Sequence, residues 1–365
     1  MKSLEDFKEE IHRCSKCGLC QAVCPLYEIT GNECTVSRGQ FIMLDGVVKK
    51  DLKMNKNINK YLDICLKCGK CSGFCPSNID IVEILLHAKH EYFKKSLSGT
   101  IYKILESKFV FNNLLKILKL IGRFFCKKKK SKSYEKKAIY FGGCISKLRP
   151  DVDNYIIDLL NEMRIEVLET DFNCCGMPFL TTGNLERFQE QAIENIKKID
   201  NDIDYLIMDC ASCEWAWKQY SKYIDDETLK EKLSKICFKN IYDFIAESDL
   251  EFISKTKKVV TYHKPCHQES IDNILKIISK CKNIEYKEMD GHDKCCGFAS
   301  FEHPQTLNIN NEILKEKRKN IKSVKADFVL TTCVGCLISL NIITLFHSKI
   351  QRLLTFLKDE CNLKD

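Results

Sequence analysis

Two cysteine runs near the start of this 365-residue chain restrict its fold and chemistry more than any other feature. Residues 14–25 read CSKCGLCQAVCP and residues 65–76 read CLKCGKCSGFCP. Both follow the pattern C-x₂-C-x₂-C-x₃-C-P, which is the ligand pattern of a cubane [4Fe–4S] cluster. Two copies in one chain predict a pair of clusters that carry single electrons.

The spacing also predicts which cysteine binds which cluster. Three cysteines at i, i+3 and i+6 wrap one loop around a cluster, and Gly18 and Gly69 let backbone N–H groups approach the sulfides. In two-cluster ferredoxins the fourth cysteine of each run binds the other cluster. The expected metal-ligand sets are Cys14, Cys17, Cys20 and Cys75 for one cluster, and Cys65, Cys68, Cys71 and Cys24 for the other.

A pair of zinc sites is the main alternative for these runs. Structural zinc prefers two C-x₂-C pairs at a longer separation and does not need the trailing Cys-Pro. The pattern therefore favours iron–sulfur clusters over zinc.

Length and cysteine content bound the class of protein. A chain of 365 residues can form two or three domains with real cores. It has 23 cysteines, and its first residues, MKSLEDFKEE, are polar and charged, with no pattern of a secretory signal. Cysteines in ligand patterns belong to a reducing compartment. We therefore expect a cytoplasmic protein.

Basic residues gather in one stretch. The net charge is +8, and residues 127–137 carry seven lysines against one glutamate. Such a run can bind nucleic acid or an anionic membrane, but it is more often a solvated linker, which is the interpretation we favour. No nucleic-acid partner is expected.

The segment before the lysine run is amphipathic. Residues 101–125 show apolar side chains at helical spacing and also carry six charged residues, so they are too polar to span a bilayer. We expect a helix pair with a basic face. Three positions stay open for it: packing on the protein, packing on a partner subunit, or lying peripherally at the inner face of a membrane.

Beyond residue 137 the chain is built twice. The run AIYFGGC ends at Cys144, and VVTYHKPC ends at Cys266. A Cys-Cys-Gly and then a C-x₂-C follow each of them, at offsets of 121 to 123 residues between the two copies. A fixed period indicates a duplication, and strands alternating with helices predict parallel sheets whose carboxyl ends gather these cysteines.

The expected fold class is thus α+β and α/β, with an N-terminal all-helical dicluster ferredoxin module followed by two duplicated α/β lobes. The expected domains are a dicluster domain at 1–96, amphipathic helices and a basic linker at 97–137, a first cysteine-rich lobe at 138–250 and a second at 251–365.

Each lobe has five cysteines, one more than a cubane needs. Structural zinc would leave one thiol over, and a disulfide between adjacent cysteines would be strained. An unusual, more open iron–sulfur centre fits the count best.

With these motifs the chain resembles the iron–sulfur proteins with two cysteine-rich CCG domains. That family includes the catalytic subunits of heterodisulfide reductase and the iron–sulfur subunits of glycolate oxidase, of lactate-utilisation systems and of anaerobic glycerol-3-phosphate dehydrogenase. The resemblance covers almost the whole chain, including the SRG segment at 37–39. It implies that each complete lobe holds a non-cubane [4Fe–4S] cluster through five cysteines, with a disulfide cleaved between the two clusters.

Carried over residue by residue, the resemblance implies two further ligand sets and a catalytic group. The cofactor-binding sets are Cys144, Cys174, Cys175, Cys210 and Cys213 in the first lobe, and Cys266, Cys295, Cys296, Cys333 and Cys336 in the second. The catalytic candidates are Cys174, Cys175, Cys295 and Cys296. Some relatives of the glycolate oxidase group have lost cysteines from a lobe, whereas this chain keeps all ten.

Two functions follow from the resemblance. The first is an electron-transfer subunit that passes electrons between a flavoprotein dehydrogenase of the 2-hydroxy acid type and an acceptor. The second is a thiol–disulfide reductase that acts at the paired non-cubane clusters, in which case the two CCG edges should face each other. The sequence has no dinucleotide fingerprint or P-loop, so an FAD-linked partner subunit, and hence a hetero-oligomer, is expected.

A few other residues have weaker indications. His263 and His267 flank Cys266, where they would either donate protons to a leaving thiolate or orient the loop by hydrogen bonds. Lys147 and Arg149 would either steer an anionic substrate or lie exposed. We interpret the remaining cysteines as ordinary thiols, namely Cys34, Cys126, Cys237, Cys281 and Cys361.

Overall fold

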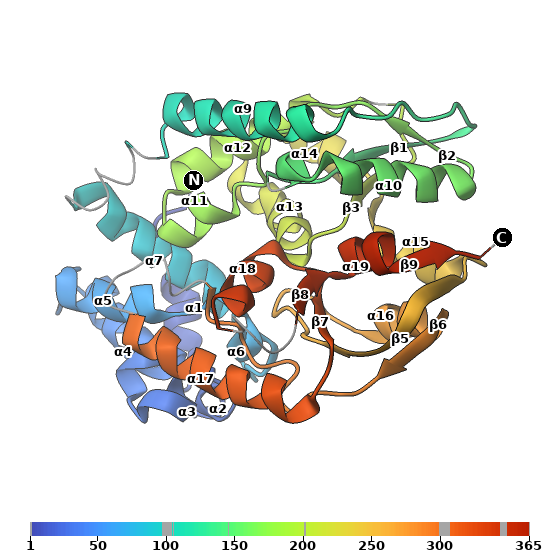
Figure 1. Ribbon diagram of the computed structural model, residues 1–365. Helices are drawn as coiled ribbons and strands as arrows, with labels where there is room; N and C mark the ends of the chain where they lie inside the picture. The colour runs from blue at the N-terminus through green and yellow to red at the C-terminus, as the bar shows by residue number, and fades with distance from the viewer. Residues whose placement is uncertain are drawn as a thin grey trace.

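The computed structural model describes residues 2–96, 104, 106–144, 146–200, 202–298, 307–343 and 349–364. It has an N-terminal helical module and two α/β units, which we call lobe one (138–250) and lobe two (251–365) (Figure 1). This arrangement confirms the expected fold class.

The N-terminal module is entirely helical among its described residues. Its elements are η1 (Leu4–Phe7), α1 (Lys8–Arg13), α2 (Leu19–Ala22), α3 (Pro25–Thr30), η2 (Glu33–Thr35), α4 (Ser37–Val48), α5 (Lys56–Ile64), α6 (Lys70–Gly73) and α7 (Ile81–Lys95). The first helical segment begins at a reciprocal capping box formed by Ser3 and Asp6.

Each cysteine run turns at a glycine. Gly18 and Gly69 have φ of +86° and +76° and immediately precede the short helices α2 and α6. Other residues adopt this left-handed conformation only at a cost, so glycine allows the loop to fold back on its own cysteines.

The amphipathic segment contains a long helix. α9 (Lys108–Phe125) packs its Leu115 side into the core and leaves an apolar stripe exposed, which includes Phe109 at 79% and Phe124 at 87% exposure. Residues 101–103 and 105 of the predicted helix pair lie outside the described residues. Within the described part of the chain, we find no helix long and apolar enough to cross a membrane. The lysine run after α9 is mostly exposed and has no regular structure before residue 136.

Lobe one is a parallel sheet of four strands in the order β2-β1-β3-β4. Its strands are β1 (Lys136–Phe141), β2 (Ile165–Leu168), β3 (Tyr205–Met208) and β4 (Phe238–Asn240). Its helical segments are η3 (Ser146–Leu148), α10 (Pro150–Glu162), α11 (Met177–Thr182), α12 (Leu185–Lys197), α13 (Ala211–Tyr223), α14 (Glu227–Ser234) and α15 (Ile241–Glu247).

Lobe two repeats this plan with one addition. Strands β5 (Phe252–Tyr262), β6 (Cys281–Tyr286), β7 (Phe328–Thr331) and β8 (Lys349–Arg352) form a parallel sheet in the order β6-β5-β7-β8. A short strand, β9 (Cys361–Leu363), pairs antiparallel with β5 and was not expected from the repeat. The described helices are α16 (Asp272–Ser279), α17 (Leu307–Val324), α18 (Val334–Ile343) and α19 (Leu353–Glu360).

The three parts pack as one body. One hydrophobic cluster joins Ala138 and Ile207 of lobe one to Val260 and Phe328 of lobe two. A second joins Val82 of α7 to the buried cysteines of both lobes. α17 also lies across the N-terminal module, against α3 (Figure 1). The cysteine-bearing edges of all three parts therefore meet in the interior.

Candidate iron–sulfur sites

The structure gathers the eight cysteines of the N-terminal runs into two sets. Cys14, Cys17 and Cys20 line one cavity together with Cys75 from the other run. Cys65, Cys68 and Cys71 line a second cavity together with Cys24. These are the groupings that the crossed ligand pattern predicts, although the binding of iron itself stays a prediction.

The two cavities differ in exposure. Cys17 is exposed, and a hydrogen bond from the Leu19 backbone lowers the pKa of its thiol. Cys71 is deeper, and burial raises its pKa to about 12. Because burial penalises the thiolate, the second set needs a bound cation to ionise its sulfurs. The first set therefore includes the one exposed cysteine of the eight, whereas all four cysteines of the second set are half-buried.

The five cysteines of lobe one converge where its strands end. Cys144 follows β1, the adjacent pair 174–175 precedes α11, and Cys210 opens α13 directly after β3. The Cys174 thiol contacts those of Cys144 and Cys175, while the Cys213 thiol contacts those of Cys175 and Cys210. The N–H of Gly176 donates to Cys174 Sγ at 3.4 Å. The five sulfurs thus form one connected group.

Lobe two repeats the arrangement with its own five cysteines. Cys295 contacts Cys266 and Cys296. Cys296 Sγ lies 3.2 Å from Cys336 Sγ, and Cys336 in turn contacts Cys333. The N–H of Gly297 donates to Cys295 Sγ at 3.3 Å, as Gly176 does in lobe one.

The thiol groups of the two lobes meet at their C-x₂-C loops. The Cys210 and Cys333 thiols contact each other, and the N–H of Ala211 donates to the Thr332 carbonyl at 3.3 Å. Ser212 Oγ lies 3.0 Å from Cys333 Sγ. The thiol groups of the two lobes therefore adjoin each other at these loops, while the arrangement of the CCG edges that a disulfide reductase requires stays a prediction.

The second cavity of the N-terminal module lies against lobe two. Burial raises the pKa of Cys68, and the charge of Cys295 in lobe two adds to this shift. The hydrogen bond with Cys295 and burial raise the pKa of Cys266, and the charge of Cys68 adds to that shift from across the boundary. A salt bridge of 2.8 Å between Lys70 and Asp293 closes the same boundary. The sulfur groups thus run in sequence from the first cavity to the second, then to lobe two and lobe one.

The grouped, buried thiols fit a bound cation rather than free thiols. Hydrogen bonds from Cys174 and Cys213 lower the pKa of Cys175 to about 6, whereas a contact with Cys175 raises that of Cys213. In lobe two, the hydrogen bond between Cys266 and Cys295 likewise lowers the pKa of Cys295 and raises that of Cys266. Each buried group can thus hold only part of its thiolate charge unless a cation neutralises it.

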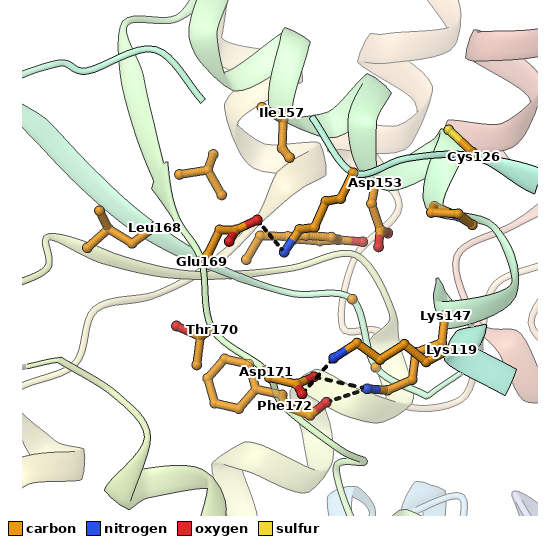
Figure 2. A pocket seen from close by; sticks show the side chains of 16 residues that line it. Lys119, Cys126, Lys147, Asp153, Ile157, Leu168, Glu169, Thr170, Asp171 and Phe172 are labelled. Atoms are coloured by element: carbon orange, nitrogen blue, oxygen red, sulfur yellow. Dashed lines mark hydrogen bonds and ion pairs between the residues drawn. The ribbon is translucent and has the colours of Figure 1, made fainter. Parts of the chain in front are cut away.

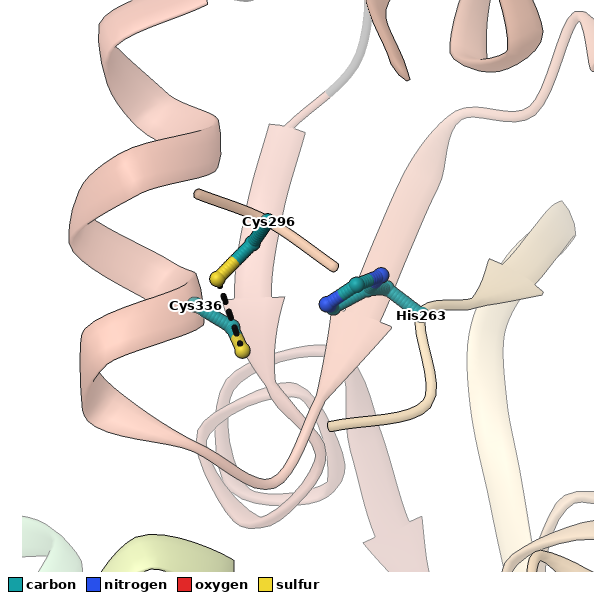
Figure 3. Close-up of side chains that lie close together, drawn as sticks. All are labelled: His263, Cys296 and Cys336. Atoms are coloured by element: carbon teal, nitrogen blue, oxygen red, sulfur yellow. Dashed lines mark hydrogen bonds between the residues drawn. The ribbon is translucent and has the colours of Figure 1, made fainter. Parts of the chain in front are cut away.

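The flanking histidines have different surroundings. His267 stacks on Trp215 with ring centroids 4.5 Å apart, and its Nε2 lies 3.2 Å from the Lys67 carbonyl. It therefore ties lobe two to lobe one and to the second cysteine run, which fits an orienting role. The His263 ring points toward Cys296 and Cys336 (Figure 3).

Lys147 and Arg149 are both held by the protein. Lys147 Nζ donates to the Phe172 carbonyl at 2.7 Å and lies 3.5 Å from Asp171, in a pocket that Lys119 and Asp153 also line (Figure 2). Arg149 makes two hydrogen bonds of 2.9 Å to Asp151. One of the two expectations was that these side chains steer an anionic substrate. With these contacts neither side chain is available to do so.

The five remaining cysteines lie apart from the ligand groups. Cys281 and Cys361 are buried in β6 and β9, two strands that both pair with β5. Their thiols contact each other. Cys237 is exposed, and Cys34 and Cys126 are half-buried.

Several residues of the site carry no motif signal. Ser212 and Trp215 are identified only by the structure, because nothing in their spacing marks them. Lys317 is different: it corresponds to Asn195 in the repeat, and comparing the two copies position by position would have singled it out.

Comparisons with known proteins agree with this geometry. A cysteine-rich domain model matches residues 138–218 and again 260–341. A 4Fe-4S dicluster domain model matches residues 10–79. The matches fall in lobe one, lobe two and the N-terminal module, in that order.

Several named proteins are similar to this chain over most of its length. The probable glycolate oxidase iron-sulfur subunit of Bacillus subtilis is 23% identical, over 94% of this chain and 92% of its own. The glycolate oxidase iron-sulfur subunit of Escherichia coli is 20% identical, over 89% and 88%. One subunit of the fumarate reductase (CoM/CoB) of Methanothermobacter marburgensis is 24% identical, over 91% and 68%.

One solved structure supports the fold alone. The crystal structure of a hypothetical protein from Helicobacter pylori superposes with a TM-score of 0.51 at 12% identity. The match covers 89% of this chain and 67% of that one.

Proposed function

Since the chain belongs to the iron–sulfur proteins that join a 4Fe-4S dicluster domain to cysteine-rich CCG domains, we propose that it is the electron-transfer subunit of an oxidoreductase complex. The observation that carries this proposal is the unbroken order of four sulfur groups. The order begins at the exposed Cys17 and passes through the second cavity to lobe two and lobe one.

Iron–sulfur clusters bound to these groups would supply one-electron transfer. The chain holds the ligands in fixed order, and most cysteines of the two lobes are buried. Cys24 and Cys75 each line the cavity of the other run, so a cluster in either cavity would connect the two loops of the N-terminal module. The Cys210–Cys333 contact brings the groups of the two lobes together in the same way.

We infer that the partner is a flavoprotein dehydrogenase that oxidises a 2-hydroxy acid. The names of the Bacillus and Escherichia relatives support this inference, as does the name of Lactate utilization protein A of Lysinibacillus sphaericus, which is 23% identical over 52% of this chain. The partner would deliver or accept electrons at the exposed first cavity, and the complex would work in the cytoplasm.

A reconstitution experiment tests this function. The anaerobically purified chain is mixed with an FAD-linked 2-hydroxy acid dehydrogenase encoded beside it, and lactate or glycolate is added. We expect the cluster absorbance to bleach at a rate that depends on the partner's concentration. If the reduced flavoprotein leaves the chain oxidised while dithionite reduces it, the flavoprotein assignment is wrong.

A second candidate is a thiol–disulfide reductase. The adjoining thiol groups of the two lobes favour it, because cleavage of a disulfide yields two thiolates and each lobe could receive one. All ten lobe cysteines are present as well.

The two candidates differ in how they use the lobes. The dithionite-reduced chain is offered a mixed disulfide of coenzyme A, and its reoxidation is followed by absorbance. A reductase would be reoxidised, and Cys175→Ala and Cys296→Ala would each abolish this. A relay would be reoxidised only by a flavoprotein or quinone, and one of the two variants would keep most of its turnover.

We also propose that α9 and the following lysine run lie on an anionic membrane surface. Residues 108–132 contain nine basic residues and no acidic one. Among the described residues, Lys116, Lys127, Lys130 and Lys132 make no ion pair. These free cations flank the exposed apolar stripe of α9, which is the combination that binds anionic lipid at an interface.

Vesicle sedimentation tests the membrane contact. The chain should pellet with phosphatidylglycerol vesicles and stay in the supernatant with phosphatidylcholine vesicles. Phe124→Glu should abolish pelleting, and Leu52→Glu, at an exposed leucine of the N-terminal module, should not. If the chain fails to pellet and Phe124→Glu instead weakens binding of the flavoprotein, this face belongs to the partner.

A further inference from the structure

The two lobes match in backbone but differ in the side chains around their thiols. Corresponding positions lie 122 or 123 residues apart, in the register of the cysteine motifs and of helices α12 and α17. Where lobe one has apolar or neutral residues, lobe two has more polar or charged ones. The matched pairs are Phe141 and His263, Phe188 and Asn310, Asn195 and Lys317, and Ala216 and Ser339.

Lobe one surrounds its thiols with an aromatic wall. Phe141 and Trp217 are fully buried and meet edge to face, with ring centroids 5.4 Å apart. The side chain of Asn195 already has a hydrogen-bond partner within the lobe, because its amide donates to the Cys174 carbonyl at 2.7 Å. Arg352, a buried cation that acts on Cys210, is ion-paired with the buried Asp209. Among the described residues, the wall itself therefore contains no cation to stabilise added negative charge, and its one polar atom without a hydrogen bond is Trp217 Nε1.

Lobe two places a buried cation beside its thiols. Lys317 is 2% exposed and interacts with Cys295 and Cys296. Its ammonium donates to the Gly291 carbonyl at 2.6 Å but makes no ion pair with a carboxylate in the described part of the chain. Asp293, the acidic group that acts on it, is paired with Lys70. A buried ammonium without an anion is costly, so this lysine indicates negative charge on the thiols.

Two polar side chains of lobe two are buried without hydrogen bonds of normal geometry among the described residues. They are His263, through both ring nitrogens, and Asn310, through both amide atoms. The ligating atoms of His263, Cys296 and Cys336 all lie within 4.8 Å of one another (Figure 3). Asn310 packs against Gly297, directly after the adjacent cysteines. Both groups are therefore available to a bound cluster.

We propose that the two lobes hold unequal centres, and that the centre of lobe two has the higher reduction potential. The proposal rests on the proposed function, in that both lobes must bind a cluster. A nearby cation and N–H donors stabilise the extra negative charge of the reduced state, which raises the potential of an iron–sulfur centre. Electrons from the N-terminal module would then reside in lobe two, which that module contacts directly, before they reach lobe one.

An anaerobic redox titration followed by EPR tests the order of the two potentials. The variants Cys213→Ala and Cys336→Ala, each disrupting one lobe, assign the signals. In the wild-type protein the lobe-two signal should change at a higher potential than the lobe-one signal. Equal potentials, or the reverse order, would overturn the proposal.

Exchanging residues between the lobes tests the cause. Lys317→Asn and His263→Phe install the lobe-one residues, and each should lower the midpoint potential of lobe two without moving that of lobe one. Lys319→Asn removes an exposed lysine from the same helix and should shift neither. A shift no larger than in this control would contradict the proposal. If a variant fails to bind iron, the order of the two midpoint potentials in the wild-type protein still tests the proposal.

Iron and sulfide analysis separates this proposal from the proposed function. Lobes that contain no cluster would contradict both. Full loading with equal potentials would overturn only the inequality.

Discussion

At the scale of single residues, the two CCG glycines fix the geometry of the adjacent cysteines. Gly176 and Gly297 have φ of +80° and +76°, and each donates its N–H to the sulfur two residues earlier. A Cβ on Gly297 would lie 2.2 Å from the Asn310 amide oxygen, and one on Gly176 would lie 2.9 Å from the Phe188 ring. Both positions therefore exclude a side chain through conformation and through space.

We expect Gly297→Ala to destabilise the protein by roughly 2–4 kcal/mol, because left-handed strain and overpacking add at this position. Lobe two should also lose iron. Gly73→Ala is the matched control, since its Cβ would meet no atom within 4 Å. Urea unfolding and iron content measure both effects, and equal behaviour of the two variants would show that the glycine is not needed.

A second residue-scale prediction concerns the crossed ligands. Cys75 lines the cavity of Cys14, Cys17 and Cys20 rather than that of its own run. Cys75→Ser should therefore perturb the EPR signal of the first cluster, and Cys24→Ser that of the second. If Cys75→Ser altered only the cluster of Cys65, Cys68 and Cys71, the assignment would be wrong.

Asp153 makes stability depend on pH. Burial raises its pKa to about 7 from an ordinary value of 3.8, and the negative charge of Asp209 adds to the shift. Between these values the carboxyl is protonated in the folded chain and ionised in the unfolded chain, so its contribution to stability falls as pH rises from about 4 to about 7.

Asp153→Asn should accordingly raise the free energy of unfolding by roughly 4 kcal/mol at pH 8 and change it little at pH 4. Urea unfolding at the two pH values checks this. A gain of the same size at both would mean that the carboxyl is not the cause.

At the scale of elements, α7 joins the N-terminal module to lobe one. Its buried Lys89 lies 3.2 Å from Asp63 of α5 and donates to the Thr181 carbonyl of α11 at 2.7 Å. The neighbouring His90 Nδ1 lies 2.8 Å from the Gly183 carbonyl. The helix therefore holds the cysteine runs in a fixed position relative to the lobe.

Removing Lys89 should leave Asp63 as a buried charge with its ion pair broken. We expect Lys89→Met to cost about 3 kcal/mol of stability, and the double variant Lys89→Met/Asp63→Leu to recover part of the loss. Denaturant unfolding of the three chains measures it. If the double variant loses more unfolding free energy than the two single variants lose together, this account of the pair is contradicted.

At the scale of the whole molecule, the cysteine patterns predicted both the fold class and the grouping of the first eight cysteines, because motif spacing and repeat period can be read directly from the sequence. The contact between Cys210 and Cys333 could not be predicted, since no periodicity shows how two lobes pack. β9 was missed for a similar reason, because a three-residue edge strand carries almost no pattern. Lys317 was missed because a single lysine in a helix looks like a surface residue.

The central claim, four iron–sulfur centres in one chain, is tested most directly by its metal content. We predict about 16 irons and as many labile sulfides per chain after anaerobic purification, four for each centre. About 8 irons would mean that the two lobes hold no cluster of this size. Stoichiometric zinc without sulfide would contradict the whole account.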